Sequence, residues 1–284
     1  MEHLQNLIVN YKIPIGIWIA NFVNAINGGG FFDAISNTLG GVIDGFTTVL
    51  RAVPGPLLIV VIVAITFALQ RSWKLALFVG LALLFIMNQG YWRQTLETLS
   101  LIMFATITSM AIGVPIGIAT AHRPWLFVII RPVLGLMQTL PTFVYLIPTL
   151  VLFGLGAVPG LISTIIFTLP APIRLTHLGI SSVPEPLLEA GQAFGATRAQ
   201  QLWKIELPYA LPTIMAGLTQ CIMLSLSMVV IAALVGAGGL GVPVVRALNS
   251  VRVDIGFESG LSIVLLAIVL DRVCRPRESR SRAH

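Results

Sequence analysis

Seven apolar stretches dominate this sequence and restrict the folds that it can adopt. A helix needs about 20 apolar residues to cross roughly 30 Å of hydrocarbon. The candidate segments are residues 55–70, 74–90, 97–121, 133–153, 157–173, 211–236 and 257–272, of which the first and last are short. Only 10% of the 284 residues are charged, against about 25% in soluble domains. The sequence therefore predicts an all-α integral membrane protein with about seven spans.

The distribution of lysine and arginine predicts how these spans are oriented, because such residues are enriched in cytoplasmic loops. With the segment after Asp271 inside the cell, five basic residues face outward: Lys12, Arg51, Arg93, Arg246 and Arg252. Twelve face inward: Arg71, Lys74, Arg123, Arg131, Arg174, Arg198, Lys204, Arg272, Arg275, Arg277, Arg280 and Arg282. This bias places residues 181–210 and the C-terminus in the cytoplasm. An even number of spans would invert only the first segments.

Both ends of the chain differ from the apolar middle. Residues 1–52 contain two stripes of apolar residues at helical spacing, which predict amphipathic helices packed across the outer face of the spans. A signal peptide is disfavoured, since Met1 to Tyr11 has no basic start followed by an apolar run. Residues 53–272 form the transmembrane domain. We interpret the basic tail 273–284 as a positive-inside anchor and not a nucleic-acid patch, because it carries no interleaved aromatic residues.

A polar island at residues 181–210 interrupts the apolar pattern. Pro184 and Pro186 suit the first turn of a helix, and Gly195 can take the left-handed conformation that ends it. Thr197 and Gln200 have the spacing of a capping box, which predicts a second helix that Pro208 ends. The island is therefore expected to form two short helices joined at an elbow. Its expected apolar face comprises Leu187, Leu188, Ala190 and Phe194. The alternative is an ordinary loop on the bilayer surface.

Several classes of chemistry lack support in the sequence. No ionisable residue lies in the middle of a candidate span, which disfavours an ion-coupled carrier. The four histidines are scattered, and neither a His-Glu-x-x-His segment nor a nucleophile elbow is present. No phosphate-binding Gly-x-x-x-x-Gly-Lys-Ser/Thr loop occurs either, so ATP and Mg²⁺ would have to bind another polypeptide. We expect no cofactor in this chain, and we interpret Cys221 and Cys274 as packing residues.

Residues 236–241 read Gly-Ala-Gly-Gly-Leu-Gly, which matches the dinucleotide-binding pattern Gly-x-Gly-x-x-Gly. That pattern indicates nucleotide binding only between a strand and a helix of a βαβ unit. Here it follows a predicted span. The segment is therefore expected to be a flexible or closely packed helix exit near the outer surface.

The polar island resembles the EAA loop of bacterial ABC importer permeases. Their pattern is Glu-Ala-Ala, three residues, Gly, nine residues, then Ile-x-Leu-Pro, and only Gly191 departs from it, standing at the second alanine. The resemblance implies a loop, residues 181–210, that couples to a cytoplasmic ATPase. The implied coupling residues are Glu189, Ala190, Gly191, Phe194, Gly195, Ile205, Leu207 and Pro208.

A finer resemblance covers roughly residues 90–272. Segments 138–148, 153–156 and 170–176 are similar to permeases for glycine betaine, proline and choline. The resemblance implies a permease subunit of an ATP-driven importer of quaternary ammonium compounds. The alternatives are a permease for another small solute such as an amino acid, or an ATP-independent carrier.

The resemblance also implies a type I importer in the bacterial inner membrane. Such a complex contains two permease copies, two cytoplasmic ABC ATPases that bind ATP and Mg²⁺, and a periplasmic substrate-binding protein. A homodimer follows if the second permease is a copy of this chain.

The translocation pathway is harder to place from the sequence. Pro141 and Pro148 interrupt the span predicted at 133–153 and free backbone carbonyls, which is tolerated where a helix lines a cavity or packs against neighbours. Helix–helix packing by small and polar residues explains the same pattern. The candidate pathway residues are Met137, Gln138, Thr139, Phe143 and Tyr145.

Overall fold

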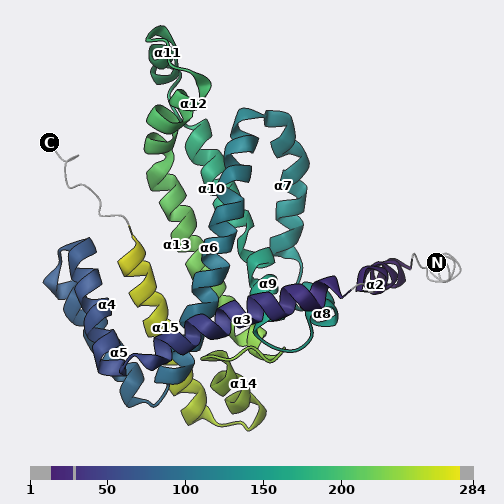
Figure 1. Ribbon diagram of the computed structural model, residues 1–284, viewed down its shortest axis with the longest axis vertical. Helices are drawn as coiled ribbons and strands as arrows, with labels where there is room; N and C mark the ends of the chain where they lie inside the picture. The colour runs from purple at the N-terminus through teal and green to yellow at the C-terminus, as the bar shows by residue number, and fades with distance from the viewer. Residues whose placement is uncertain (1–13, 28–29, 276–284) are drawn as a thin grey trace, which may run out of the picture.

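The computed structural model describes residues 14–27 and 30–275, in which all regular elements are helices (Figure 1). They are α2 (Ile15–Ile26), α3 (Phe31–Ala52), α4 (Gly55–Gln70), α5 (Trp73–Asn88), α6 (Trp92–His122), α7 (Pro124–Thr139), α8 (Thr142–Phe153), α9 (Ala157–Thr168), α10 (Pro170–Ser181), α11 (Glu185–Ala193), α12 (Arg198–Gln201), the π-helical turn η2 (Leu202–Glu206), α13 (Leu207–Ala233), α14 (Gly241–Asn249) and α15 (Val253–Cys274).

Four of these helical segments are long and apolar enough to cross a membrane, and six qualify if each of two bent pairs counts as one span. The four are Trp92–His122, Ala157–Ser181, Arg198–Ala233 and Val253–Cys274. By this criterion the described residues provide four to six spans, fewer than the seven expected. The difference has three causes. Helix α5, predicted as a span, has only 16 residues, and α4 qualifies only together with α3. The stretch predicted at 133–153 qualifies only as the bent pair of α7 and α8.

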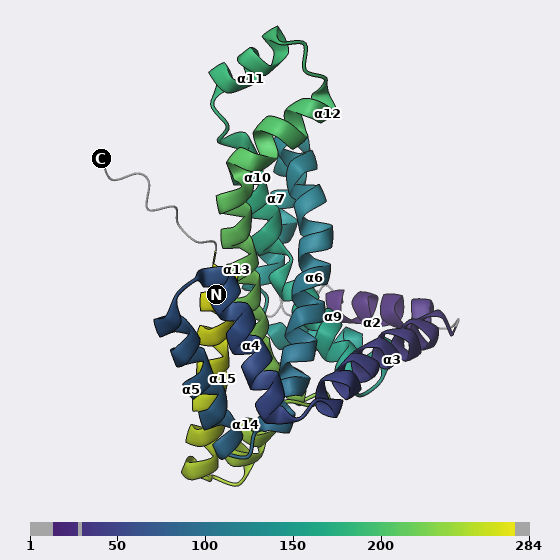
Figure 2. The same ribbon diagram turned by 60° about the vertical axis from the view of Figure 1, so that its left-hand side comes forward.

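The centre of the molecule is built from α6, α10 and α13, which run side by side (Figure 2). Gly113 and Gly117 of α6 face α10, so that a Cβ atom on Gly117 would lie 2.5 Å from the Cβ of Thr176. One on Gly113 would lie 2.7 Å from the Cγ of Pro172. Small residues four apart thus let the two helix backbones approach closely, as in other membrane helix pairs.

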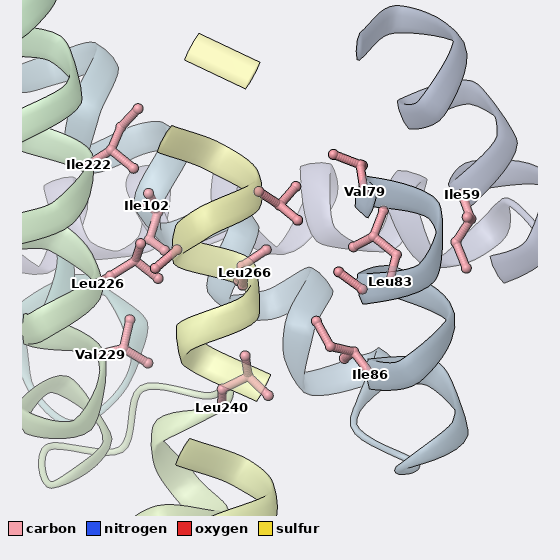
Figure 3. Packing of buried hydrophobic residues seen from close by; sticks show 13 residues of the cluster. Ile59, Val79, Leu83, Ile86, Ile102, Ile222, Leu226, Val229, Leu240 and Leu266 are labelled. Atoms are coloured by element: carbon pink, nitrogen blue, oxygen red, sulfur yellow. The ribbon is translucent and has the colours of Figure 1, made fainter. Parts of the chain in front are cut away.

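A peripheral group of α4, α5 and α15 joins this centre through the largest apolar cluster (Figure 3). Val79, Leu83 and Ile86 of α5 are almost fully buried in it. Leu226 of α13 and Leu266 of α15 complete the contact. Because these side chains come from helices far apart in sequence, the cluster fixes the peripheral group against the centre.

Helix α3 lies across α6, α8 and α9 (Figure 1), in the N-terminal segment that was predicted to be amphipathic. Ile43 and Thr47 are buried against the bundle, and the Thr47 hydroxyl donates to Ser100 Oγ at 2.9 Å. At the end of the helix, Arg51 forms an ion pair with Glu97 of α6. The shorter predicted helix is α2, whereas the parts of the N-terminal segment at residues 1–13 and 28–29 lie outside the described residues.

The glycine-rich segment after α13 is closely packed, which is one of the two predicted alternatives. The Leu240 N–H donates to Thr98 Oγ1 at 2.8 Å. Gly239 has φ +114°, a conformation that side chains rarely adopt. A Cβ atom on Gly241 would lie 2.8 Å from the carbonyl carbon of Val229 and 2.9 Å from the Cα of Val230. The segment therefore folds back onto the end of α13 with no room for a further carbon atom at position 241.

The predicted interruption of the span 133–153 is confirmed at Pro141 and wrong at Pro148. Helices α7 and α8 meet there at 92°. Leu140 has φ −64° and ψ 135°, an extended conformation. A proline favours that conformation in the residue before it, and Pro141 follows. Pro148, by contrast, stays inside α8.

The prediction that Pro208 ends a helix is also wrong. Residues 198–233 form one helical segment of 36 residues, in which α12, η2 and α13 follow without a break. A proline ring clashes with the carbonyl four residues earlier in a regular α-helix. The wider π turn η2 comes directly before Leu207 and Pro208, and it changes the position of that carbonyl.

Candidate functional site

The predicted elbow at residues 181–210 has the expected local geometry. Helix α11 precedes Gly195, whose φ of +78° is left-handed. The capping box is present, because Gln200 N–H donates to Thr197 Oγ1 at 3.3 Å and Thr197 N–H donates to Gln200 Oε1 at 2.9 Å. Helices α11 and α12 form an arch that projects at one end of the bundle (Figure 2).

The eight predicted coupling residues divide into an exposed group and a packed group. Glu189, Ala190, Phe194, Gly195 and Pro208 are exposed, and the Phe194 side chain is 93% exposed. The packed residues are Gly191, Ile205 and Leu207.

Gly191 explains the departure of this chain from the Glu-Ala-Ala pattern. It is buried, and a Cβ atom there would overlap Cδ1 of Ile205. The missing side chain brings α11 directly against η2, so that two positions of the motif, 14 residues apart, pack together. An alanine would require the flexible end of Ile205 to move.

Sequence reasoning missed a pair of residues beneath the elbow. Glu206 is buried, and its Oε2 accepts a hydrogen bond from His122 Nε2 at 2.7 Å. Glu206 occupies the variable position of the Ile-x-Leu-Pro motif, and His122 is the last residue of α6. The contact connects the π turn to a helix 84 residues earlier in the chain. The sequence carried one signal of this pair, the carboxylate of Glu206 just before the apolar stretch 211–236.

We predict that His122→Phe lowers the free energy of unfolding by about 1–3 kcal/mol, because it leaves a buried carboxylate without its partner. Chemical unfolding of the purified permease in detergent measures this change. Glu206→Gln keeps an acceptor for the His122 N–H and serves as the matched control. The double variant His122→Phe/Glu206→Leu should recover part of the loss, since both polar groups are then absent. Wild-type stability of His122→Phe would contradict the assignment.

The candidate pathway residues lie on both sides of the bend between α7 and α8. Met137 and Gln138 are partly exposed near the end of α7, and Thr139 Oγ1 donates to Gly135 O at 3.0 Å. On α8, Phe143 is 52% exposed, and the hydroxyl of Tyr145 has no partner among the described residues. The five residues thus flank one break between two helices, and their role in a pathway stays a prediction.

Arg174 lies toward the end of a helical segment that is longer than the predicted span. Helices α9 and α10 form one segment from Ala157 to Ser181, longer than the predicted 157–173. Arg174 lies inside this segment, and its Nη1 donates to Gln138 Oε1 at 2.9 Å. A guanidinium group therefore lies next to the bend between α7 and α8.

Known proteins are similar to this chain in sequence and in fold. The family described as binding-protein-dependent transport system inner membrane component matches residues 113–275. The glycine betaine transport system permease protein OpuAB of Bacillus subtilis is 45% identical over 264 residues, which cover 92% of this chain and 93% of that protein. The glycine betaine/proline betaine transport system permease protein ProW of Escherichia coli is 40% identical, over 100% of this chain and 82% of that protein.

A solved structure of the MetNI methionine ABC transporter resembles the fold. The TM-score is 0.57 at 23% sequence identity, over 65% of this chain and 94% of the matched chain. At this identity the likeness concerns the fold alone. The family match covers residues 113–275, more than half of this chain. This chain belongs to the family of inner membrane components of binding-protein-dependent transport systems.

Proposed function

We propose that this chain is the permease subunit of an ATP-driven importer of quaternary ammonium solutes such as glycine betaine and choline. The observation that carries the proposal is the 45% identity to a glycine betaine permease over nearly the full length of both chains. The motif and the elbow at residues 181–210 support the same class. An amino acid permease shares the fold, but at only 23% identity.

The proposed complex contains two copies of this chain, two cytoplasmic ATPases that bind ATP and Mg²⁺, and an external substrate-binding protein. The exposed residues Glu189, Ala190 and Phe194 contact the ATPase. Movement of the ATPase then reaches η2 through the packing of Gly191 on Ile205, and continues into α13. Such a helical segment can serve as a two-state element that a ligand on another subunit biases.

The bend between α7 and α8 is the proposed part of the pathway. The exposed ring of Phe143 offers a π-face, which attracts a quaternary ammonium group without a fixed negative charge. Arg174 lies beside Gln138 and supplies a positive charge for the carboxylate of a zwitterion such as glycine betaine. A site along a transport pathway must release its solute as well as bind it. We therefore expect moderate affinity for the solute here.

The test is uptake by proteoliposomes that contain the permease, its ATPase and its substrate-binding protein. Labelled glycine betaine, choline, proline and methionine are compared with and without ATP. ATP-dependent uptake of glycine betaine or choline is the expected result. Uptake of methionine alone would refute the proposed substrate class but would agree with an ATP-driven importer. Uptake by the permease without ATPase would favour an ATP-independent carrier.

We also predict that the two ends of the bundle label from opposite sides of the membrane. Single cysteines at Gln192, exposed on α11, and at Leu155, 78% exposed, are introduced in a background without Cys221 and Cys274. In intact spheroplasts an impermeant maleimide should label only Leu155→Cys, and in inverted vesicles only Gln192→Cys. Labelling of Gln192→Cys in spheroplasts would rule out a cytoplasmic elbow.

A further inference from the structure

A cavity of about 630 Å³ lies between the end of α6 and the elbow. It is lined by His122, Arg123, Leu188, Arg198, Ala199, Gln201, Leu202 and Glu206. One wall is the corner between α6 and α7, and the others come from α11, α12 and η2. The cavity therefore adjoins the predicted coupling loop but includes a part of the chain that the EAA motif does not cover.

The charges that line the cavity do not balance within the chain. Glu206 is the one carboxylate in the lining, and it already accepts a hydrogen bond from His122. Arg123 and Arg198 are exposed, and neither forms an ion pair within residues 14–27 and 30–275. Two guanidinium groups thus face the same opening without an acidic partner. A carboxylate in the cavity would accept charge-assisted hydrogen bonds from both.

The position of the cavity favours a protein partner. Helix α6 has 31 residues and a length of about 46 Å, whereas the hydrocarbon core is about 30 Å thick. An untilted α6 thus has enough length to carry His122 and Arg123 past the hydrocarbon edge. Beside the cavity, Leu187 is 45% exposed and Phe194 is 93% exposed. Exposed aromatic residues next to arginines are typical of the centres of protein interfaces.

We propose that an acidic side chain of the ATPase subunit enters this cavity and binds Arg123 and Arg198. The proposal rests on the proposed function, which supplies the ATPase, and it adds a second point of attachment beside the elbow. The ATPase then holds the α6–α7 corner and α12 together. A closing movement of the ATPase therefore acts on α6 and α13 at once, with the contact between His122 and Glu206 lying between them.

Charge reversal tests this attachment. The variants are Arg123→Glu, Arg198→Glu and the double reversal, and Lys74→Glu is the matched control because Lys74 is exposed at the start of α5, outside the lining. Binding of the ATPase subunit to the permease in nanodiscs is measured over a range of NaCl concentrations. The double reversal should weaken binding by at least about tenfold at low salt, since like charges then face each other. It should also flatten the salt dependence. Lys74→Glu should change neither.

Further arms separate the possible outcomes. Acidic residues on the permease-facing surface of the ATPase are replaced by lysine one at a time. One of these replacements should restore binding to Arg198→Glu, which would also show that the reversed permease is folded. Unchanged binding in the double reversal would overturn the proposal. An effect that appears only in discs with anionic lipid would assign the arginines to lipid and would also overturn it. If Phe194→Ala weakens binding while the reversals do not, the attachment fails and the proposed function stands. If the wild-type permease binds no ATPase, the proposed function fails.

Discussion

Gly241→Ala should remove most of the folded permease from the membrane. The added Cβ atom would lie 2.8 Å from the carbonyl carbon of Val229 and 2.9 Å from the Cα of Val230, and closer still to the Val229 oxygen. All three are backbone atoms of α13, so that no side chain can rotate away. Overpacking of this kind costs about 1–3 kcal/mol and sometimes more. That is a large share of the roughly 5–15 kcal/mol that stabilises a typical protein.

The measurement is the amount of monodisperse permease after detergent extraction, together with its thermal unfolding. Gly260→Ala is the matched control, because a Cβ atom there meets no other atom within 4 Å. It adds the same methyl group to α15 and should leave the yield unchanged. Equal yield and stability of the two variants would show that the glycine-rich segment is not packed as described.

Gly195→Val should abolish ATP-dependent uptake while the protein remains in the membrane. Gly195 has φ +78°, and a Cβ atom at this position would meet no other atom within 4 Å, so the cost comes from the backbone conformation alone. A β-branched residue in the left-handed region costs about 1–3 kcal/mol locally. The elbow is expected to relieve this strain by changing its angle, which separates α11 from the position that the ATPase requires.

Uptake into proteoliposomes and the amount of permease in the membrane are measured together. Gly195→Asn is the control, since asparagine tolerates the left-handed conformation better than other residues with a side chain. It should retain most of the uptake. Normal transport by Gly195→Val in the assembled complex would exclude a rigid elbow as the coupling element.

The elbow could be predicted because its determinants are local. Two prolines, a glycine and a capping box each fix the backbone locally, and all of them lie between residues 184 and 200. The amphipathic helix α3 was predictable for the same reason, since its period is visible in the sequence. The pairs His122–Glu206 and Arg174–Gln138 could not be predicted, because the partners are 84 and 36 residues apart.

The sequence predicted that Pro141, Pro148 and Pro208 each interrupt a helix, and of these three the structure shows a break only at Pro141. Pro141 ends α7 while Pro208 stays within a helical segment, although both follow a leucine in the sequence. The difference lies in the backbone before each proline: Leu140 is extended, whereas Leu207 is helical and follows the π turn. A π turn has no reliable sequence signal, and its wider hydrogen-bonded ring forms only where tertiary packing favours it.

The unbroken helical segment from Arg198 to Ala233 has a mechanical consequence. The 27 residues of α13 span about 40 Å, so the helix acts as a lever arm with its short end at the elbow. A pivot of about 5° at the π turn would displace the far end by roughly 3.5 Å, as follows from the helix rise. That far end carries the glycine-rich segment, where position 241 has no room for a methyl group. A small rotation at the elbow would thus displace the opposite end of the bundle without passing through a flexible loop.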